Sequence, residues 1–170
     1  MFTRWLWATK NDFEADDWKL IASAPIIAAA VISASDDVGD DRDSEDEEIN
    51  AFKVALEKFE SRYAKSALVS DVLSYIKAEG TEEFEVLFSA LSAAASHESP
   101  LEDRVKSIGQ AGEIVDRIAD KKEAKLYKNF IVDAATAVAT ASKKGFFVFS
   151  SSISKKEDFY LRQIQSVLGV

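Results

Sequence analysis

Residues 20–35 read LIASAPIIAAAVISAS, and this stretch decides the fold. Its 16 residues are too few to cross a membrane, and the serines and Pro25 also weigh against a membrane span. Four acidic residues stand between positions 12 and 17, where a secretory signal would carry positive charge. The alanine and isoleucine content predicts a core helix from about Glu14 to Ser35, bent near Pro25 and buried on most sides.

The rest of the chain also has helical character. Only 6 Gly and 2 Pro occur in 170 residues, and so few helix breakers favour long helices. Apolar residues at spacings of three and four predict helices at about 14–35, 44–63, 68–80, 81–91, 99–118, 121–142 and 154–169. Ile118 and Phe159 belong to these rows of apolar residues and are predicted to face the core. A strand is considered only at 146–149. We predict an all-α, single-domain bundle of about seven helices over residues 14–170, on which an aromatic arm, residues 1–13, packs.

Local signals set several of these boundaries. Residues 44–47 and 154–157 both have the Ser-x-x-Glu pattern of a capping box, which opens a helix. Gly80 is expected to end one helix, because glycine favours the conformation that follows a helix C-terminus. Gly109 and Gly112 are expected to let a neighbouring helix approach closely.

The negative charge of the chain is concentrated in one segment. Residues 36–48 hold nine acids and one arginine, a charge of −8, whereas the other residues hold 21 acids and 20 bases, a charge of −1. Binding to a nucleic-acid backbone needs clustered Lys and Arg, so this class of partner is not expected. We call residues 36–48 the acidic segment.

Three interpretations of the acidic segment stay open: a solvated loop, a surface for a basic protein partner, and a divalent-cation site. Ca²⁺ and Mg²⁺ need several oxygen ligands, and only this segment supplies them densely. No register fits an EF-hand, because Gly39 lacks acids at the required offsets. The candidate cation ligands are Asp36, Asp37, Asp40, Asp41, Asp43 and Glu47.

Residue types that carry common catalysis are scarce. The chain has no cysteine and one histidine, His97, which excludes thiolate chemistry and a two-histidine metal site within one chain. No Walker loop, dinucleotide-binding glycine motif or nucleophile elbow occurs. We therefore expect a protein that is not an enzyme, and the lack of cysteine fits a reducing cytoplasm.

Aromatic residues outside the predicted helices form the second candidate site. Phe146, Phe147 and Phe149 lie in one loop, and Trp5 and Trp7 lie in the N-terminal arm. Such side chains either cover the core or provide a docking surface for a protein partner. Two lysines before the phenylalanines also keep a weak membrane contact open.

Two helix–loop–helix units of the chain are alike. Residues 27–35 and 134–142 are both alanine-rich and end in Ala-Ser, and a loop and a capping box follow each. An ancient duplication or a pseudo-two-fold bundle would produce this similarity, and so would alanine-rich composition by chance.

Several short motifs resemble a known family. The matching residues are Asp17-Trp18, Ala24-Pro25, Ala34-Ser35-Asp36, and Ser44 with Glu47. On these residues the chain resembles the TerB-like family, named for the tellurite-resistance protein TerB and found also at the start of the DjlA co-chaperone. The family usually has glycine where Asp37 stands, and its loop is several residues shorter.

The resemblance implies an all-helical bundle without catalysis, linked to metal or stress response, whose clustered carboxylates are suspected of binding a cation. Our leading expectation is a cytoplasmic partner-binding or stress-response module that uses the acidic segment. The alternatives are a protein that responds to Ca²⁺ or Mg²⁺ and a peripheral membrane scaffold that uses the phenylalanine-rich loop.

Overall fold

The computed structural model describes residues 8–35, 42–93, 99–141 and 153–170. The α-helices of these ranges are α1 (Ala15–Ser35), α2 (Arg42–Arg62), α3 (Ala67–Tyr75), α4 (Thr81–Ala93), α5 (Ser99–Ile118), α6 (Lys121–Ala141) and α7 (Lys155–Leu168). A 3-10 helix, η1 (Lys10–Asp12), and a π-helix, η2 (Ile76–Gly80), complete the elements. The described residues contain no strand, and the prediction of an all-α, single-domain bundle is confirmed. The strand considered at 146–149 lies outside the described residues.

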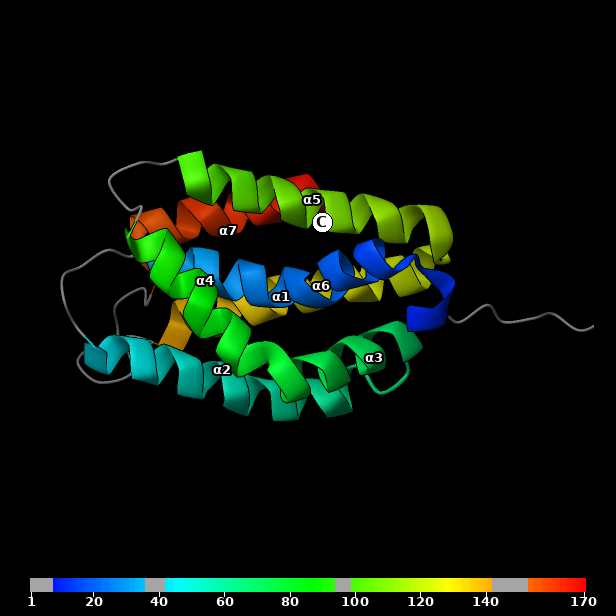
Figure 1. Ribbon diagram of the computed structural model, residues 1–170, viewed down its shortest axis with the longest axis horizontal. Coiled ribbons are helices and arrows are strands. Elements are labelled where there is room, and N and C mark those ends of the chain that lie inside the picture. Colours follow the sequence, from blue (N-terminus) through cyan, green and yellow to red (C-terminus); the bar gives the residue numbers. More distant parts are fainter. Residues whose placement is uncertain (1–7, 36–41, 94–98, 142–152) are drawn as a thin grey trace, which may run out of the picture.

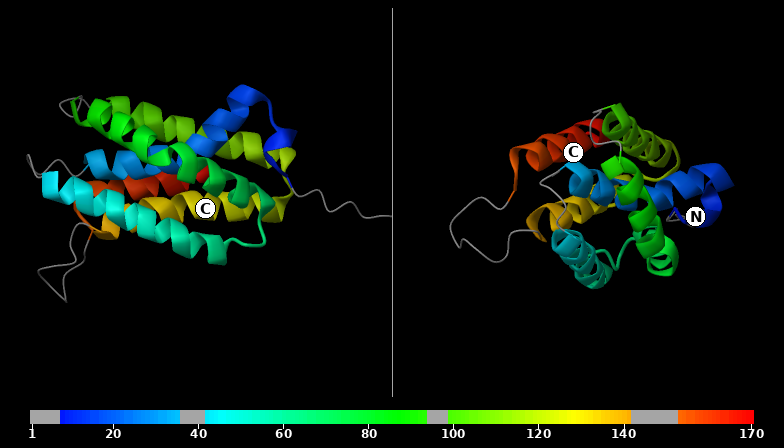
Figure 2. Two further views of the ribbon diagram at one scale, coloured as in Figure 1. Left: turned by 60° about the horizontal axis from the view of Figure 1, so that its bottom comes forward. Right: turned by 60° about the vertical axis from the view of Figure 1, so that its left-hand side comes forward.

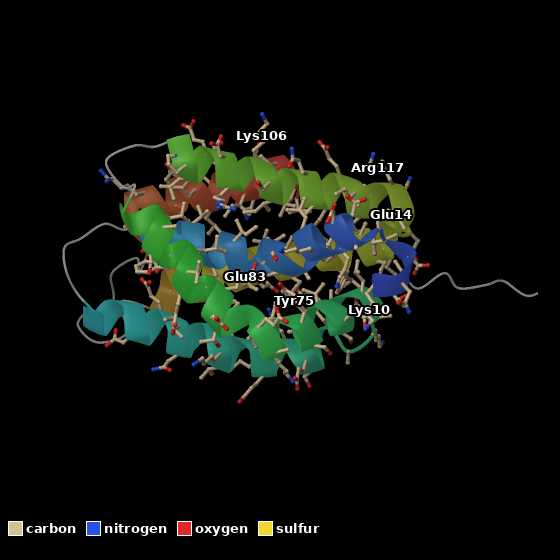
Figure 3. All side chains as sticks on the ribbon, viewed as in Figure 1. Lys10, Glu14, Tyr75, Glu83, Lys106 and Arg117 are labelled. Carbon is tan, nitrogen blue, oxygen red and sulfur yellow. The ribbon has the colours of Figure 1, made fainter. Side chains whose placement is uncertain are left out.

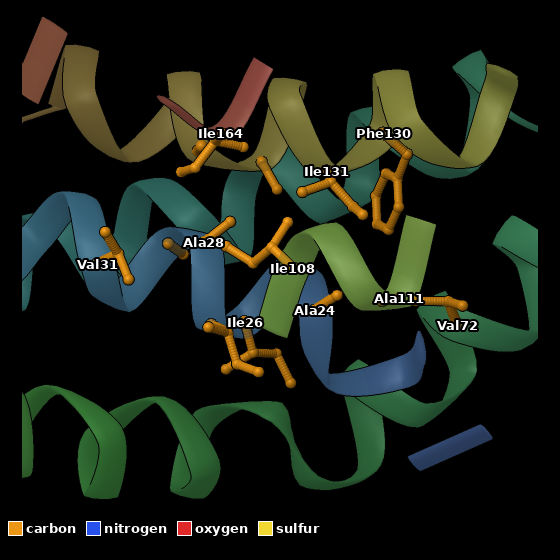
Figure 4. Close-up of a cluster of buried hydrophobic side chains, with 14 of the residues drawn as sticks. Ala24, Ile26, Ala28, Val31, Val72, Ile108, Ala111, Phe130, Ile131 and Ile164 are labelled. Carbon is orange, nitrogen blue, oxygen red and sulfur yellow. The ribbon is translucent and has the colours of Figure 1, made fainter. Parts of the chain in front are cut away.

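The helix α1 runs through the middle of the bundle (Figure 1, Figure 2). It packs mainly against α5 and α6, and also against α4 and α7. Residues 21–35 are all buried, and Figure 4 shows Ala28 of α1 in one apolar cluster with Ile108 of α5 and Ile164 of α7. The helix has 21 residues, so the argument that the segment is too short to cross a membrane is wrong. By length and composition alone α1 could cross a membrane, but in the structure other helices enclose it. The predicted core helix is therefore confirmed.

The helices α3 and α4 are joined by η2 into one bent helix. The backbone stays helical at Tyr75, Ile76 and Thr81, on both sides of the π-helical turn. The prediction that Gly80 ends a helix is therefore wrong, because the π-helical turn carries the chain through the glycine. A Cβ atom at Gly80 would lie 2.7 Å from Cγ2 of Ile76, so only glycine fits this turn without displacement of its neighbour.

The ends of α7 follow the predicted signals. Ser154 is the N-cap, its hydroxyl accepts from the Glu157 amide, and the Glu157 side chain closes the capping box. Gly169 ends the helix with a φ of 70°, in the left-handed region that favours glycine. By contrast, α2 begins at Arg42, so Ser44 lies inside the helix and is not its N-cap. The acids of the first turn favour this earlier start, since they stabilise a helix N-terminus.

The helices α5 and α7 approach each other closely at the two predicted glycines. A Cβ atom at Gly109 would lie 3.0 Å from Cβ of Val167, and one at Gly112 would lie 2.9 Å from Cδ2 of Leu168. The expected close contact is confirmed. Ile118 and Phe159 are not inside as predicted, because their side chains are 45% and 54% exposed.

The described part of the N-terminal arm packs on the body. Ala8 and Phe13 are buried, and the Phe13 ring stacks on Trp18 with a centroid distance of 6.4 Å. The Lys10 amide donates to the Asp71 carboxylate at 2.9 Å, which ties η1 to α3.

Candidate functional site

Several helices begin or end at one end of the bundle (Figure 1). These are the ends of α1, α4 and α6 and the starts of α2, α5 and α7. We call this region the loop-bearing end. The acidic segment falls here, because residues 36–48 connect the end of α1 with the start of α2.

The predicted cation ligands are described only in part. Asp36, Asp37, Asp40 and Asp41 lie outside the described residues. Asp43 lies in the first turn of α2, and Glu47 lies one turn further along with its side chain exposed to solvent. Acids in the first turn are stabilised by the positive end of the helix dipole. The structure thus fixes Glu47 on the surface of the loop-bearing end.

The last acid of the segment, Glu48, belongs to the core. Its side chain is 4% exposed, and its carboxylate accepts a hydrogen bond from the Ser33 hydroxyl of α1. A buried carboxylate needs such a donor, since loss of hydration is otherwise uncompensated. Our sequence reasoning counted Glu48 among the surface acids. Its position four residues before the buried Phe52 is a signal of inward orientation that we missed.

Two further glutamates are buried, at positions that composition did not reveal. Glu157 is 1% exposed at the start of α7, within the capping box described above. Glu123 is 2% exposed, and its Oε1 accepts from the Ser66 hydroxyl at 2.6 Å and from the Leu68 amide at 2.9 Å. Glu123 of α6 therefore caps the N-terminus of α3. In the two similar helix–loop–helix units Glu47 corresponds to Glu157, yet Glu47 is exposed and Glu157 is buried.

No group of three or more His, Cys, Asp or Glu side chains in the described ranges is placed to hold a metal ion. Some of the described acids instead have partners within the fold. Four ion pairs, Arg62–Asp133, Lys77–Glu60, Lys128–Asp116 and Arg162–Asp158, join described side chains. A ligand set for Ca²⁺ or Mg²⁺ would therefore have to draw on the acids that lie outside the described residues.

The aromatic candidates Phe146, Phe147, Phe149, Trp5 and Trp7 lie outside the described residues. An aromatic residue that the sequence reasoning missed, Phe159, is 54% exposed near the start of α7. Its ring makes an edge contact with Tyr160 at a centroid distance of 5.2 Å. The helical stripe predicted Phe159 inside, so no sequence signal pointed to this exposure.

No family model, no curated protein and no solved structure matches the chain. The resemblance to the TerB-like family therefore stays a prediction from the residues quoted above.

Proposed function

We propose that the protein is a non-catalytic helical module that binds a basic protein partner through the acidic segment at the loop-bearing end. The observation that carries this proposal is the charge distribution, with −8 of the net −9 in residues 36–48. The resemblance to the TerB-like family adds the expectation of a stress-response role of the tellurite-resistance type, located in the cytoplasm.

Anchoring of the segment to the core supports a role in binding. Glu48, Ile49 and Phe52 are buried, so the start of α2 is held against the body while Glu47 faces solvent. Like charges that are close in the sequence repel each other, by about 0.6 kcal/mol for two unit charges about 7 Å apart in water. A basic surface would relieve this repulsion and would be attracted over a distance set by salt screening.

Outside the acidic segment, acidic and basic residues are nearly equal in number, with 21 acids and 20 bases. All four ion pairs between described side chains lie outside the acidic segment. Glu47, the one acid of the segment that the structure shows on the surface, forms no ion pair with a described residue. The negative charge at the loop-bearing end is thus the strongest electrostatic feature that a partner would meet.

The test compares two variants of equal net charge. The first converts Asp36, Asp37, Asp40, Asp41 and Asp43 to Asn. The matched control converts five exposed acids elsewhere to Gln, namely Glu57, Glu82, Glu85, Glu102 and Glu113. Isothermal titration of the full chain with an oligolysine peptide should show binding that weakens with salt, that the first variant loses and that the control keeps. Equal loss in both variants would show that total charge alone attracts the peptide, and the proposal would be wrong.

The same variants test the divalent-cation alternative, which the density of carboxylates favours. A ligand that binds only the folded chain raises the melting temperature by mass action. A rise with millimolar Ca²⁺ or Mg²⁺ that the Asn variant loses and the control keeps would assign the segment to a cation. Unchanged melting in both ions would remove this alternative.

A further inference from the structure

The loop-bearing end contains a recess between the end of α4 and the start of α5. These two helices both pack on α1 but scarcely touch each other, and they diverge over it (Figure 1). The recess has a volume of about 340 Å³, at the lower end of the range for small-molecule sites. Its lining residues are Ala90, Leu91, Pro100, Asp103, Arg104 and Ser107.

The α5 side of the recess carries three polar residues, Asp103, Arg104 and Ser107, and one apolar residue, Pro100. Its four residues, at positions 100, 103, 104 and 107, follow the spacing of one helix face. The core face of α5 is a different one, formed by buried apolar residues such as Leu101, Val105 and Ile108. The Ser107 hydroxyl of the recess face donates to the Asp103 backbone carbonyl at 3.1 Å. The Asp103 carboxylate and the Arg104 guanidinium make no hydrogen bond or ion pair within the described residues and are available to a ligand.

Arg104 is unusual among the described cations. Among the Lys and Arg residues whose side chains the structure describes, Arg104 and Lys128 are half-buried and the others are exposed. Lys128 is paired with Asp116 at 2.5 Å, but Arg104 makes no hydrogen bond or ion pair within the described part of the chain. Partial burial of an unpaired charge costs free energy that a counter-ion offsets. By contrast, Lys106 and Arg117 of the same helix extend into solvent (Figure 3).

We propose that this recess binds a carboxylate carried on a small apolar body, with Arg104 as the partner of the carboxylate. A guanidinium group presents parallel N–H donors that match the two oxygens of a carboxylate. Leu91, Ala90 and Pro100 supply apolar contacts for the body of the ligand. The recess has one cationic side chain, Arg104, whose single charge matches that of a carboxylate, and Asp103 leaves no surplus positive charge for a second negative charge.

Two sources carry this chemistry: a free small carboxylic acid and the C-terminus of a peptide. Both would occupy the recess through the same contact with Arg104. The recess is lined by residues of α4 and α5 and by none of residues 36–48, and its proposed ligand is an anion, so failure of either proposal leaves the other standing.

The test is a titration of the full chain, followed by amide NMR shifts, with N-acetyl-leucine as the probe. We expect saturable shifts at Ala90, Arg104 and Ser107, and none with N-acetyl-leucine amide, which has the same shape without the charge. Arg104→Gln should weaken binding by about tenfold or more, because it removes a charge-assisted pair. Arg117→Gln, on an exposed face of the same helix, is the matched control and should bind as the wild type does.

A second variant guards against an unfolded Arg104→Gln protein. Ala90 is exposed at the rim, so Ala90→Trp should keep the fold and block the recess. An N-acetylated tripeptide ending in leucine separates the sources: tighter binding than N-acetyl-leucine assigns a peptide terminus, and equal binding assigns a free small acid. The proposal is overturned if the amide binds as well as the acid, if the folded variants bind normally, or if no probe gives saturable shifts.

Discussion

The hydroxyl of Tyr127 donates a 2.7 Å hydrogen bond to the backbone carbonyl of Ile21, 106 residues away in the sequence. Pro25 lies four residues after Ile21 in α1 and has no N–H with which to complete the helical hydrogen bond. The fully buried Tyr127 of α6 therefore supplies the donor that the proline removes. A helix-breaking residue is tolerated at the centre of the bundle because a neighbouring helix compensates for it.

This compensation can be measured by a double-mutant cycle. Tyr127→Phe leaves the buried carbonyl of Ile21 without a donor, and we expect a loss of about 1–3 kcal/mol in the free energy of unfolding. In a Pro25→Ala background the new N–H bonds to Ile21, so the same change should cost clearly less. Urea denaturation of the four proteins gives the coupling. An equal cost in both backgrounds would contradict the proposed exchange of donors.

Stability should fall at alkaline pH through the tyrosines. Burial raises the pKa of the Tyr127 hydroxyl well above its ordinary value of 10.0, and burial followed by the hydrogen bond to Asp133 raises the pKa of Tyr63. Below pH 10 the tyrosine hydroxyls keep their protons in both the folded and the unfolded chain. Above pH 10 the unfolded chain loses these protons first, which favours unfolding. The free energy of unfolding should fall by up to about 1.4 kcal/mol per pH unit because of Tyr127.

The measurement is the midpoint of urea unfolding between pH 9 and pH 11, compared between the wild type and Tyr127→Phe. The variant should lose less stability over this window, because its phenyl ring has no proton to release. Parallel curves for the two proteins would show that Tyr127 does not contribute to the alkaline loss.

The buried carboxylate of Glu123 should stabilise the start of α3. Glu123→Ala removes the acceptor of the Ser66 hydroxyl and the Leu68 amide, and we expect a loss of about 1–3 kcal/mol. Glu123→Gln retains one carbonyl oxygen and should lose less. Glu113→Ala, on an exposed position of α5, serves as the control in thermal unfolding. A loss no greater than that of the control would mean that the cap adds no stability.

The effect of Gly80→Ala on stability distinguishes the π-helical turn from an ordinary α-helix. In an α-helix this change normally stabilises by about 1 kcal/mol. Here the added Cβ would meet Cγ2 of Ile76 at 2.7 Å, and both residues are buried, so we expect destabilisation. Ala78→Gly, at an exposed position of the same turn, should show only the propensity loss. If Gly80→Ala is more stable than the wild type, the turn is not the tight conformation described here.

The fold was largely predictable because its signals are local. The apolar run before Ser35, the capping box at Ser154 and the C-terminal Gly169 each act within a few residues, and each has the predicted role. Gly80 was misread, because glycine ends many helices and nothing in the sequence distinguishes a π-helical turn from a helix end. The exposure of Phe159 was also beyond prediction. The spacing of apolar residues along a helix does not show how much of that helix the neighbouring helices cover.

The sites were less predictable than the helices. Composition located the negative charge, but it did not reveal that Glu48 joins the core, because burial depends on which face of α2 meets Ser33. The recess beside Arg104 depends on how α4 and α5 diverge over α1, which is a property of three helices together. No spacing within one helix contains that information.

The central position of α1 has a consequence for synthesis of the protein. The ribosome makes α1 before α5 and α6, its main packing partners, so this apolar helix emerges long before anything can enclose it. Nascent chains that stop before α5 would expose a surface suited to aggregation or to insertion into a lipid bilayer. A chaperone that holds early intermediates should therefore raise the yield of this protein more than that of a bundle whose core helix is translated last.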